Sequence, residues 1–163
     1  MIIKKAYEYL ERETPLKHDC GKLCRKACCK GEGGIWLLPD EEILFRGRED
    51  FEIKHLDGEY NLKCSGTCDG RRYIRPFGCR IFPYFPLVEK EDGRVKVRLM
   101  LDPRGIPFCP FSRREARCEK SFERAVRKAV RLLCTHERYY TFFKNQGELL
   151  QETEILRQKL GLE

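Results

Sequence analysis

Sulfur chemistry is concentrated near the N-terminus of this chain. The segment CGKLCRKACC, residues 20–29, contains four cysteines, and the last two are adjacent. Thiolates act as nucleophiles, as redox groups and as ligands for zinc or for the iron of iron–sulfur clusters. In a reducing compartment clustered cysteines stay reduced, which favours metal binding or redox activity over disulfides. Disulfides remain an alternative, because intracellular hyperthermophile proteins contain them and 36% charged residues would suit such a protein.

The ten cysteines divide by their setting in the sequence. After Ser112 apolar residues recur at helical spacing, and Cys118 and Cys134 fall on that stripe. We expect these two to be small buried core residues. The others lie in irregular segments rich in glycine and proline, and these are the candidate metal ligands: Cys20, Cys24, Cys28, Cys29, Cys64, Cys68, Cys79 and Cys109.

The spacing of the first cysteines limits how they can share a metal. If residues 20–28 formed one straight helix, Cys20 and Cys28 would lie about 12 Å apart along its axis. Two sulfur ligands of one zinc ion lie within about 4.6 Å of each other. Either the segment bends or its cysteines serve more than one metal. Eight thiolates could form two four-sulfur centres, or one four-cysteine iron–sulfur cluster with four thiols left over.

The choice between zinc and iron–sulfur rests on the gaps between cysteines. Structural zinc knuckles favour two intervening residues, whereas the gaps here are three, three and none. This pattern favours an iron–sulfur cluster slightly over zinc. An iron–sulfur centre would allow electron transfer or redox sensing, and a closed four-thiolate zinc site would suit a structural or binding module.

A second motif, RPFGCRIFP at residues 75–83, gives Cys79 a stiff setting. Its prolines restrict the backbone at both ends, so we expect Cys79 on a rigid loop. Arg75 and Arg80 flank it, and arginines near a thiolate lower its pKa and offset the negative charge of a metal site. The alternative is that both arginines pair with surface carboxylates. His18 could add a ligand near the first cysteines, but an ordinary surface position is the stronger interpretation.

Together these motifs resemble a known family. The cysteines of residues 20–29, the following IWLLPDEE and the RPFGCRIFP segment are similar to the CxxCxxCC family, whose members are described as zinc- or iron-chelating or as iron–sulfur-cluster-containing proteins. The resemblance covers residues 18–112, and Cys109 takes the place of the family's closing cysteine. It implies a metal-binding protein and carries no generally assigned reaction.

The chain departs from the family pattern in two places. Three residues rather than two separate Cys20 from Cys24 and Cys24 from Cys28, and the intervals around Cys64 and Cys68 fit loosely. Similar cysteine clusters also occur in a flagellin lysine methylase. The resemblance therefore adds an alternative, a cluster-dependent methylation enzyme or its accessory, although no motif for a methyl donor is recognisable.

The formal charge of +7 raises the alternative of a nucleic-acid-binding zinc module. A basic stripe follows the expected C-terminal helix: Arg113, Arg117, Lys120, Arg124, Arg127 and Arg131. Thiolates at the cysteines would offset part of the charge, and Glu123 can pair with Arg127 one helical turn away. We therefore favour a solvated helix face and an unknown protein or redox partner. No nucleotide-binding glycine motif is recognisable.

The elements that must position these residues indicate a small α+β fold. The pattern predicts a helix ending before Thr14-Pro15, a buried strand at 35–38 and a short helix from Pro39. A hairpin is expected from strands at 84–90 and 94–101 with a turn at 91–93. From Ser112 the chain is expected to be helical to its end, with an interruption near Gly147.

We expect one domain over residues 1–163, with a cysteine-cluster metal-binding region at 18–112 and a helical region at 112–163. The sequence has no apolar run of the length that a signal peptide or a membrane span requires, so a cytoplasmic protein without membrane contact is expected. Whether the protein is an enzyme is left open.

Overall fold

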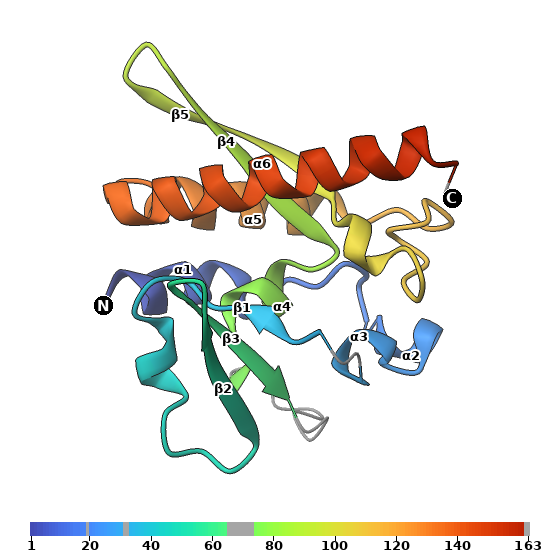
Figure 1. Cartoon of the computed structure of the whole chain (residues 1–163), viewed down its shortest axis with the longest axis horizontal. Helices are drawn as coiled ribbons and strands as arrows, with labels where there is room; N and C mark the ends of the chain where they lie inside the picture. Colours follow the sequence, from blue (N-terminus) through green and yellow to red (C-terminus); the bar gives the residue numbers. More distant parts are fainter. Residues whose placement is uncertain (19, 31–32, 65–73, 162–163) are drawn as a thin grey trace.

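Helices and two small antiparallel sheets make up an α+β fold, as the sequence predicts (Figure 1). The computed structural model describes residues 1–18, 20–30, 33–64 and 74–161. Within these ranges no helix combines the length and the apolar character that a membrane crossing requires.

The larger hairpin is formed as expected. Strand β4 (Tyr84–Glu91) pairs antiparallel with β5 (Arg94–Leu101), and Tyr84 lies opposite Leu101 at the open end. Asp92 and Gly93 at the turn both have left-handed backbone conformations, with φ of 51° and 71°. These are the conformations that a tight two-residue hairpin turn requires, and Asp-Gly sequences favour it.

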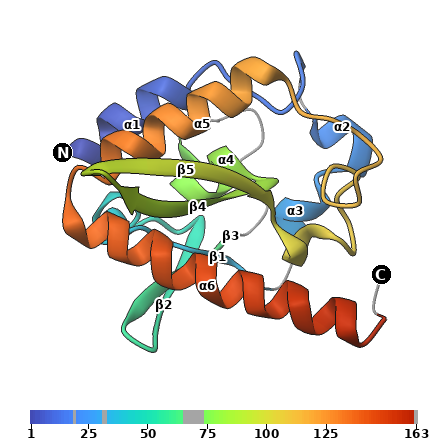
Figure 2. The same cartoon turned by 90° about the horizontal axis from the view of Figure 1, so that it is seen from above.

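Helices on both sides of this hairpin bury the main core. Helix α1 (Ile2–Leu10) packs against α5 (Lys120–Leu133), which contacts β5, while α6 (Glu137–Lys159) contacts β4. The hairpin therefore lies between α5 and α6 (Figure 2). Ile3, Ala6 and Leu10 are fully buried, which confirms the first predicted helix.

The predicted start of the C-terminal helix at Ser112 is wrong. Residues 112–119 form turns and extended chain, and α5 begins at Lys120. The reason is a tertiary contact, because the N–H of Glu119 donates to the carbonyl of Pro15 at 2.8 Å and Glu119 has an extended backbone. Cys118 consequently precedes the helix and does not belong to its apolar stripe, whereas Cys134 is buried in the main core.

The predicted interruption at Gly147 is also wrong, because α6 continues through it. The helices are instead separated by the short segment at 134–136. Gly147 is buried against β4, where an added Cβ would lie 3.0 Å from Cδ2 of Leu87. This glycine allows close helix–strand packing and does not end the helix.

The second sheet has the strand order β1-β3-β2. It consists of β1 (Ile35–Trp36), β2 (Phe51–Leu56) and β3 (Glu59–Cys64), with a turn at Asp57-Gly58. Strands β2 and β3 are not anticipated from the sequence, although Asp-Gly between two alternating segments is a hairpin signal. The sheet covers a small core of five buried residues: Leu37, Phe45, Phe51, Leu62 and Ile74.

The expected strand at 35–38 is formed at its first two residues, and Leu37 and Leu38 continue it as buried chain. The short helix expected after Pro39 is a 3-10 helix, η1 (Glu41–Leu44). It matters for the site below because Glu41 and Glu42 are both buried.

The first cysteine segment bends, as its spacing allows. It contains two short helices, α2 (Gly21–Cys24) and α3 (Ala27–Lys30). Between them Arg25 and Lys26 both have left-handed backbones, with φ of 50° and 58°. These two left-handed residues end α2 and separate it from α3, so residues 20–29 do not form one straight helix.

Candidate metal centre

A pocket of about 590 Å³ brings together cysteines that are far apart in the sequence. Its lining includes Cys28 and Cys29 from α3, Cys64 from the end of β3, and Cys79 from α4 (Phe77–Ile81). Every one of these residues is present as a thiol. Four soft ligands therefore face one cavity, which is the ligand set of zinc sites and iron–sulfur clusters.

Helix α3 supplies the adjacent pair. The sulfur atoms of Cys28 and Cys29 lie 4.0 Å apart, within the separation of about 4.6 Å that one zinc ion permits between two sulfur ligands. Cys28 is exposed, and Cys29 is half-buried against the small core. Both cysteines line the pocket, and packing against the small core holds Cys29 in place.

Strand β3 supplies Cys64 at its last residue. Cys64 lies opposite Phe51 of β2, and it shares a face of the strand with Leu62, two residues earlier. Leu62 is buried in the small core, and Cys64 also packs against this core. The hairpin of β2 and β3 therefore fixes Cys64 at the same core that holds Cys29.

Helix α4 supplies Cys79 and is held by Glu41. The carboxylate of Glu41 accepts the N–H of Phe77 at 2.6 Å and the N–H of Leu38 at 2.8 Å, and the Tyr7 hydroxyl also donates to it. Glu41 is fully buried, and this burial raises its pKa, although the three donors and the charge of Arg80 oppose the change. The network fixes the first turn of α4 against η1 and α1.

Gly78 brings α4 close to β1. A Cβ at this position would lie 2.6 Å from Cγ1 of Ile35, which is closer than packed side chains approach. Cys79 is therefore presented on a short helix that is packed on one side and exposed on the other. The expectation of a rigid loop is wrong in conformation, since Pro76 precedes a helical turn.

The two arginines of this motif have different roles. Arg80 is buried, its Nε donates to the carbonyl of Arg75 at 2.8 Å, and its guanidinium lies 3.9 Å from the ring centroid of Tyr7. Burial lowers the pKa of Arg80, while Tyr7 and the nearby acids Glu41 and Glu11 oppose this change. Arg75 lines the pocket together with Cys79.

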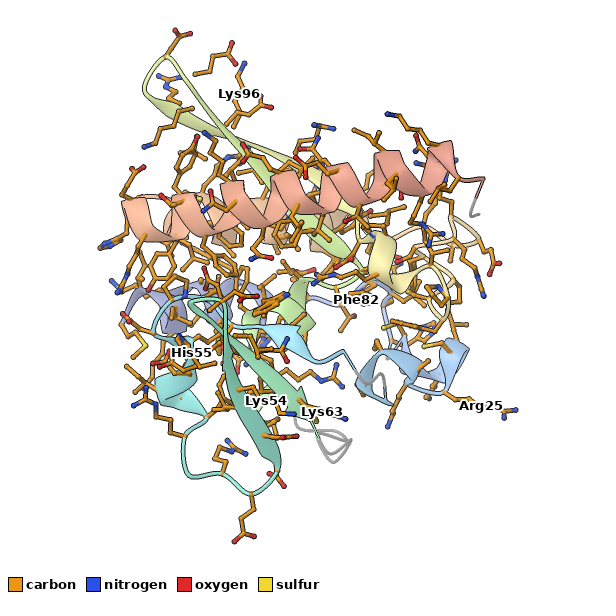
Figure 3. The ribbon with its side chains drawn as sticks, in the orientation of Figure 1. Arg25, Lys54, His55, Lys63, Phe82 and Lys96 are labelled. Carbon is orange, nitrogen blue, oxygen red and sulfur yellow. The ribbon has the colours of Figure 1, made fainter. Side chains whose placement is uncertain are left out.

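Further cations surround the pocket. Lys54, Lys63, Arg75 and Arg104 line it, against the carboxylates Glu52 and Asp102. Two of these cations form ion pairs there, Lys54 with Glu52 at 3.0 Å and Arg104 with Asp102 at 2.6 Å. Figure 3 shows Lys54 and Lys63 on β2 and β3 in the lower half of the molecule.

The lining has two more cations than carboxylates. Four thiolates around one Zn²⁺ carry two net negative charges, so these side chains would balance such a centre. Lys63, Arg104 and Glu41 are contributors that the cysteine pattern does not predict. The Asp57-Gly58 turn signal could have placed Lys63 beside Cys64 on a strand.

Aromatic side chains form part of the wall. Trp36, Phe82 and Phe108 line the pocket, and the rings of Phe82 and Phe108 are stacked with their centroids 6.2 Å apart. Figure 3 shows Phe82 nearer the centre of the molecule than the two lysines. An apolar wall restricts solvent, and solvent access is one of the factors that tune the potential of a metal centre.

The remaining candidate ligands lie elsewhere. Cys20, Cys24 and Cys109 do not line this pocket, and Cys68 lies outside the described residues. Cys109 is buried, and Cys20 and Cys24 are half-buried. Among the residues with described positions, no three Cys, His, Asp or Glu side chains converge closely enough to form a ready-made single-ion site.

Cys118, expected in the core, lies at its edge. Burial, together with Glu123, Cys109 and Cys20, raises its pKa to about 12, while a hydrogen bond with Tyr84 opposes this change. Cys118 is half-buried and packs against the main core. Its setting thus differs from that of Cys134.

The expected basic stripe is divided. Arg113 precedes α5 and pairs with Glu115 at 2.9 Å. Within α5 the predicted pair of Glu123 and Arg127 is confirmed, with a distance of 3.3 Å, and Glu123 also accepts the hydroxyl of Tyr84. These pairs are typical of a solvated helix face.

Comparison with known proteins gives no assignment. No family model, curated protein or solved structure matches the chain. The CxxCxxCC resemblance accordingly rests on the motifs themselves, and the geometry of the pocket carries the functional proposal.

Proposed function

We propose that the protein holds a thiolate-ligated metal centre in the pocket between α3, β3 and α4. The observation that carries this proposal is the convergence of Cys28, Cys29, Cys64 and Cys79 from three separate elements on one cavity. The donor set fits the group, because four cysteines are the usual ligands of structural zinc and of common iron–sulfur clusters. The resemblance of the sequence motifs to the CxxCxxCC family supports the same class of metal centre.

Of the two centres, we favour an iron–sulfur cluster. Its iron and sulfide atoms fill more space and hold their cysteine ligands farther apart than one zinc ion does. A cavity of about 590 Å³ provides that space, and no single-ion site is already assembled among the described side chains. An iron–sulfur cluster would supply one-electron chemistry, so electron transfer or redox sensing with a protein partner is the corresponding role.

The protein's own residues would hold and tune this centre. Glu41 and Gly78 fix the helix that carries Cys79, and the β2–β3 hairpin fixes Cys64. Arg75 and Lys63 would offset the charge of the thiolates, and the aromatic wall would restrict water.

The test is analysis of protein purified without oxygen. We expect iron and acid-labile sulfide to copurify with the chain and to give a broad visible absorption that bleaches on reduction. Colourless protein with stoichiometric zinc would overturn the iron–sulfur form of the proposal and support the structural form. Protein that takes up neither metal after reconstitution would overturn both forms.

A further inference from the structure

We propose that the last turns of α6 form an interface with a second copy of this chain, in which the two helices pack antiparallel. The residues of this interface do not line the pocket. The proposal therefore goes beyond the metal centre and does not depend on it.

The end of α6 carries an exposed apolar stripe. Leu149, Leu156 and Leu160 have exposed fractions of 56%, 57% and 62%. Thr153 lies on the same side of the helix, so that the four residues are spaced by four, three and four positions. This alternation of four and three is the spacing of the seam through which two helices pair.

The stripe points away from the core that α6 covers. The buried side of this part of the helix contains Gly147 and Leu150, and the helix contacts β4 and η3 (Pro103–Gly105). Because successive residues are turned by about 100° around a helix, Leu149 and Leu156 lie about 100–120° away from Leu150. The last turns of α6 also extend beyond the β4–β5 hairpin, which leaves room for a second helix (Figures 1 and 2).

A second copy fits the stripe in the antiparallel direction. With the centre of the pair between residues 154 and 155, Leu149 lies opposite Leu160 of the second copy, and Thr153 lies opposite Leu156. Each threonine then meets a leucine, whereas a parallel pair would place Thr153 opposite Thr153 in the seam. A two-fold axis relates the two chains, so every contact occurs twice.

Charges beside the stripe complement each other in this arrangement. Glu152 and Lys159 are both exposed and lie seven residues apart on one edge of the stripe. In an antiparallel pair this edge meets the same edge of the second copy, so Glu152 of each chain lies next to Lys159 of the other. Opposite charges at the edges of a helix pair determine its partner and its direction.

The length of the stripe indicates how stable this dimer is. Residues 149–160 span about 17 Å along the helix axis, at about 1.5 Å per residue. Small interfaces are typical of weak and transient complexes. We therefore expect a reversible dimer that dissociates on dilution.

The first test is sedimentation-velocity ultracentrifugation of the full chain over a wide range of concentration. Reductant is present, so that cysteines cannot link two chains. We expect the average mass to rise from that of one chain toward that of two as the concentration increases. A chain that stays monomeric at every concentration overturns the proposal.

The same measurement on two variants locates the interface. Leu156→Lys should raise the dissociation constant of the dimer by at least about tenfold, because the seam would bury a lysine without a partner. Ile155→Lys is the matched control, since Ile155 is 52% exposed on the same helix but lies off the stripe, and it should leave the dissociation constant unchanged. Equal effects of the two variants overturn the proposal.

The second test addresses the direction of the pairing. Glu152→Lys and Lys159→Glu should each weaken the dimer, because each places like charges side by side at two points. The two substitutions together should restore the affinity of the unaltered chain, and circular dichroism establishes that each variant keeps its helices. If the single variants dimerise as well as the unaltered chain, or if the double variant remains as weak as they are, the antiparallel interface is overturned.

Discussion

The carboxylate of Glu41 accepts the backbone N–H of Phe77 at 2.6 Å, which ties a buried acid in η1 to the first turn of the helix that carries Cys79. This contact joins residues 36 positions apart in the sequence. It makes the position of Cys79 depend on the main core, because Tyr7 of α1 donates to the same carboxylate.

Replacing Glu41 with glutamine should destabilise the protein. Glutamine keeps the shape of the side chain but replaces one carboxylate oxygen with an NH2 group, which cannot accept a hydrogen bond. The backbone N–H of either Phe77 or Leu38 would then be buried without its acceptor. We expect a loss of about 1–3 kcal/mol in the free energy of unfolding, measured by urea denaturation. Glu91→Gln is the control, since Glu91 pairs with Lys96 at the surface and should change stability by less than about 1 kcal/mol. Equal effects of the two variants would refute the role of Glu41.

A methyl group at Gly78 should disturb the site from the opposite side. Gly78→Ala places a Cβ 2.6 Å from Cγ1 of Ile35, and we expect it to cost about 1–3 kcal/mol and to weaken metal retention. Gly33→Ala is the matched control, because no atom lies within 4 Å of the added group. In a double-mutant cycle Ile35→Ala should recover part of the loss. Additive effects would show that the contact does not hold α4 in place.

Cys134 should make stability depend on alkaline pH. Burial raises its pKa from 9.0 to about 12, so above pH 9 the unfolded chain ionises first. Stability should therefore be unaffected below about pH 9 and fall between 9 and 12, since the folded state retains the proton. The measurement is urea denaturation at several pH values, and Cys134→Ala should lose less stability over this range. If the free energy of unfolding falls equally steeply with pH in the unaltered chain and in Cys134→Ala, the prediction is contradicted.

The basic residues just before α5 and within it should not form a nucleic-acid surface. We expect no binding of duplex DNA or RNA at physiological salt by fluorescence anisotropy, because Arg127 and Arg113 already have acidic partners. A true phosphate-binding surface would lose affinity steeply as salt rises, and replacing Arg117 and Arg124 would flatten that dependence. Tight, salt-sensitive binding that these replacements weaken would favour the nucleic-acid module.

Local patterns were sufficient for the parts of the fold whose contacts are local. The spacing of Ile3, Ala6 and Leu10 predicts α1, and the alternation before and after Asp92-Gly93 predicts the larger hairpin. The start of α5 could not be predicted in this way, because Pro15 fixes it from far along the chain. Gly147 does not end a helix, as its residue type suggested, because a glycine is needed there for close packing against Leu87 of β4.

The site was predictable in its ligand types but not in its grouping. Cysteine spacing indicates metal chemistry, whereas the fold determines that Cys64 and Cys29 pack against one core and line one pocket. The burial of Glu41 has no local signal, because acids at the start of a helix are usually exposed. The sequence therefore indicates the type of chemistry, and tertiary packing determines which cysteines can bind the same metal centre.

The most direct test of the pocket centre is the metal-to-protein ratio of purified single variants. Cys28→Ser and Cys79→Ser should each lose the pocket metal, because a hydroxyl replaces a thiolate ligand poorly. Cys134→Ala should keep its full metal content and lose only core packing, about 1 kcal/mol. If Cys28→Ser and Cys79→Ser retain as much metal as Cys134→Ala, the proposal that these thiols hold a metal in the pocket is contradicted.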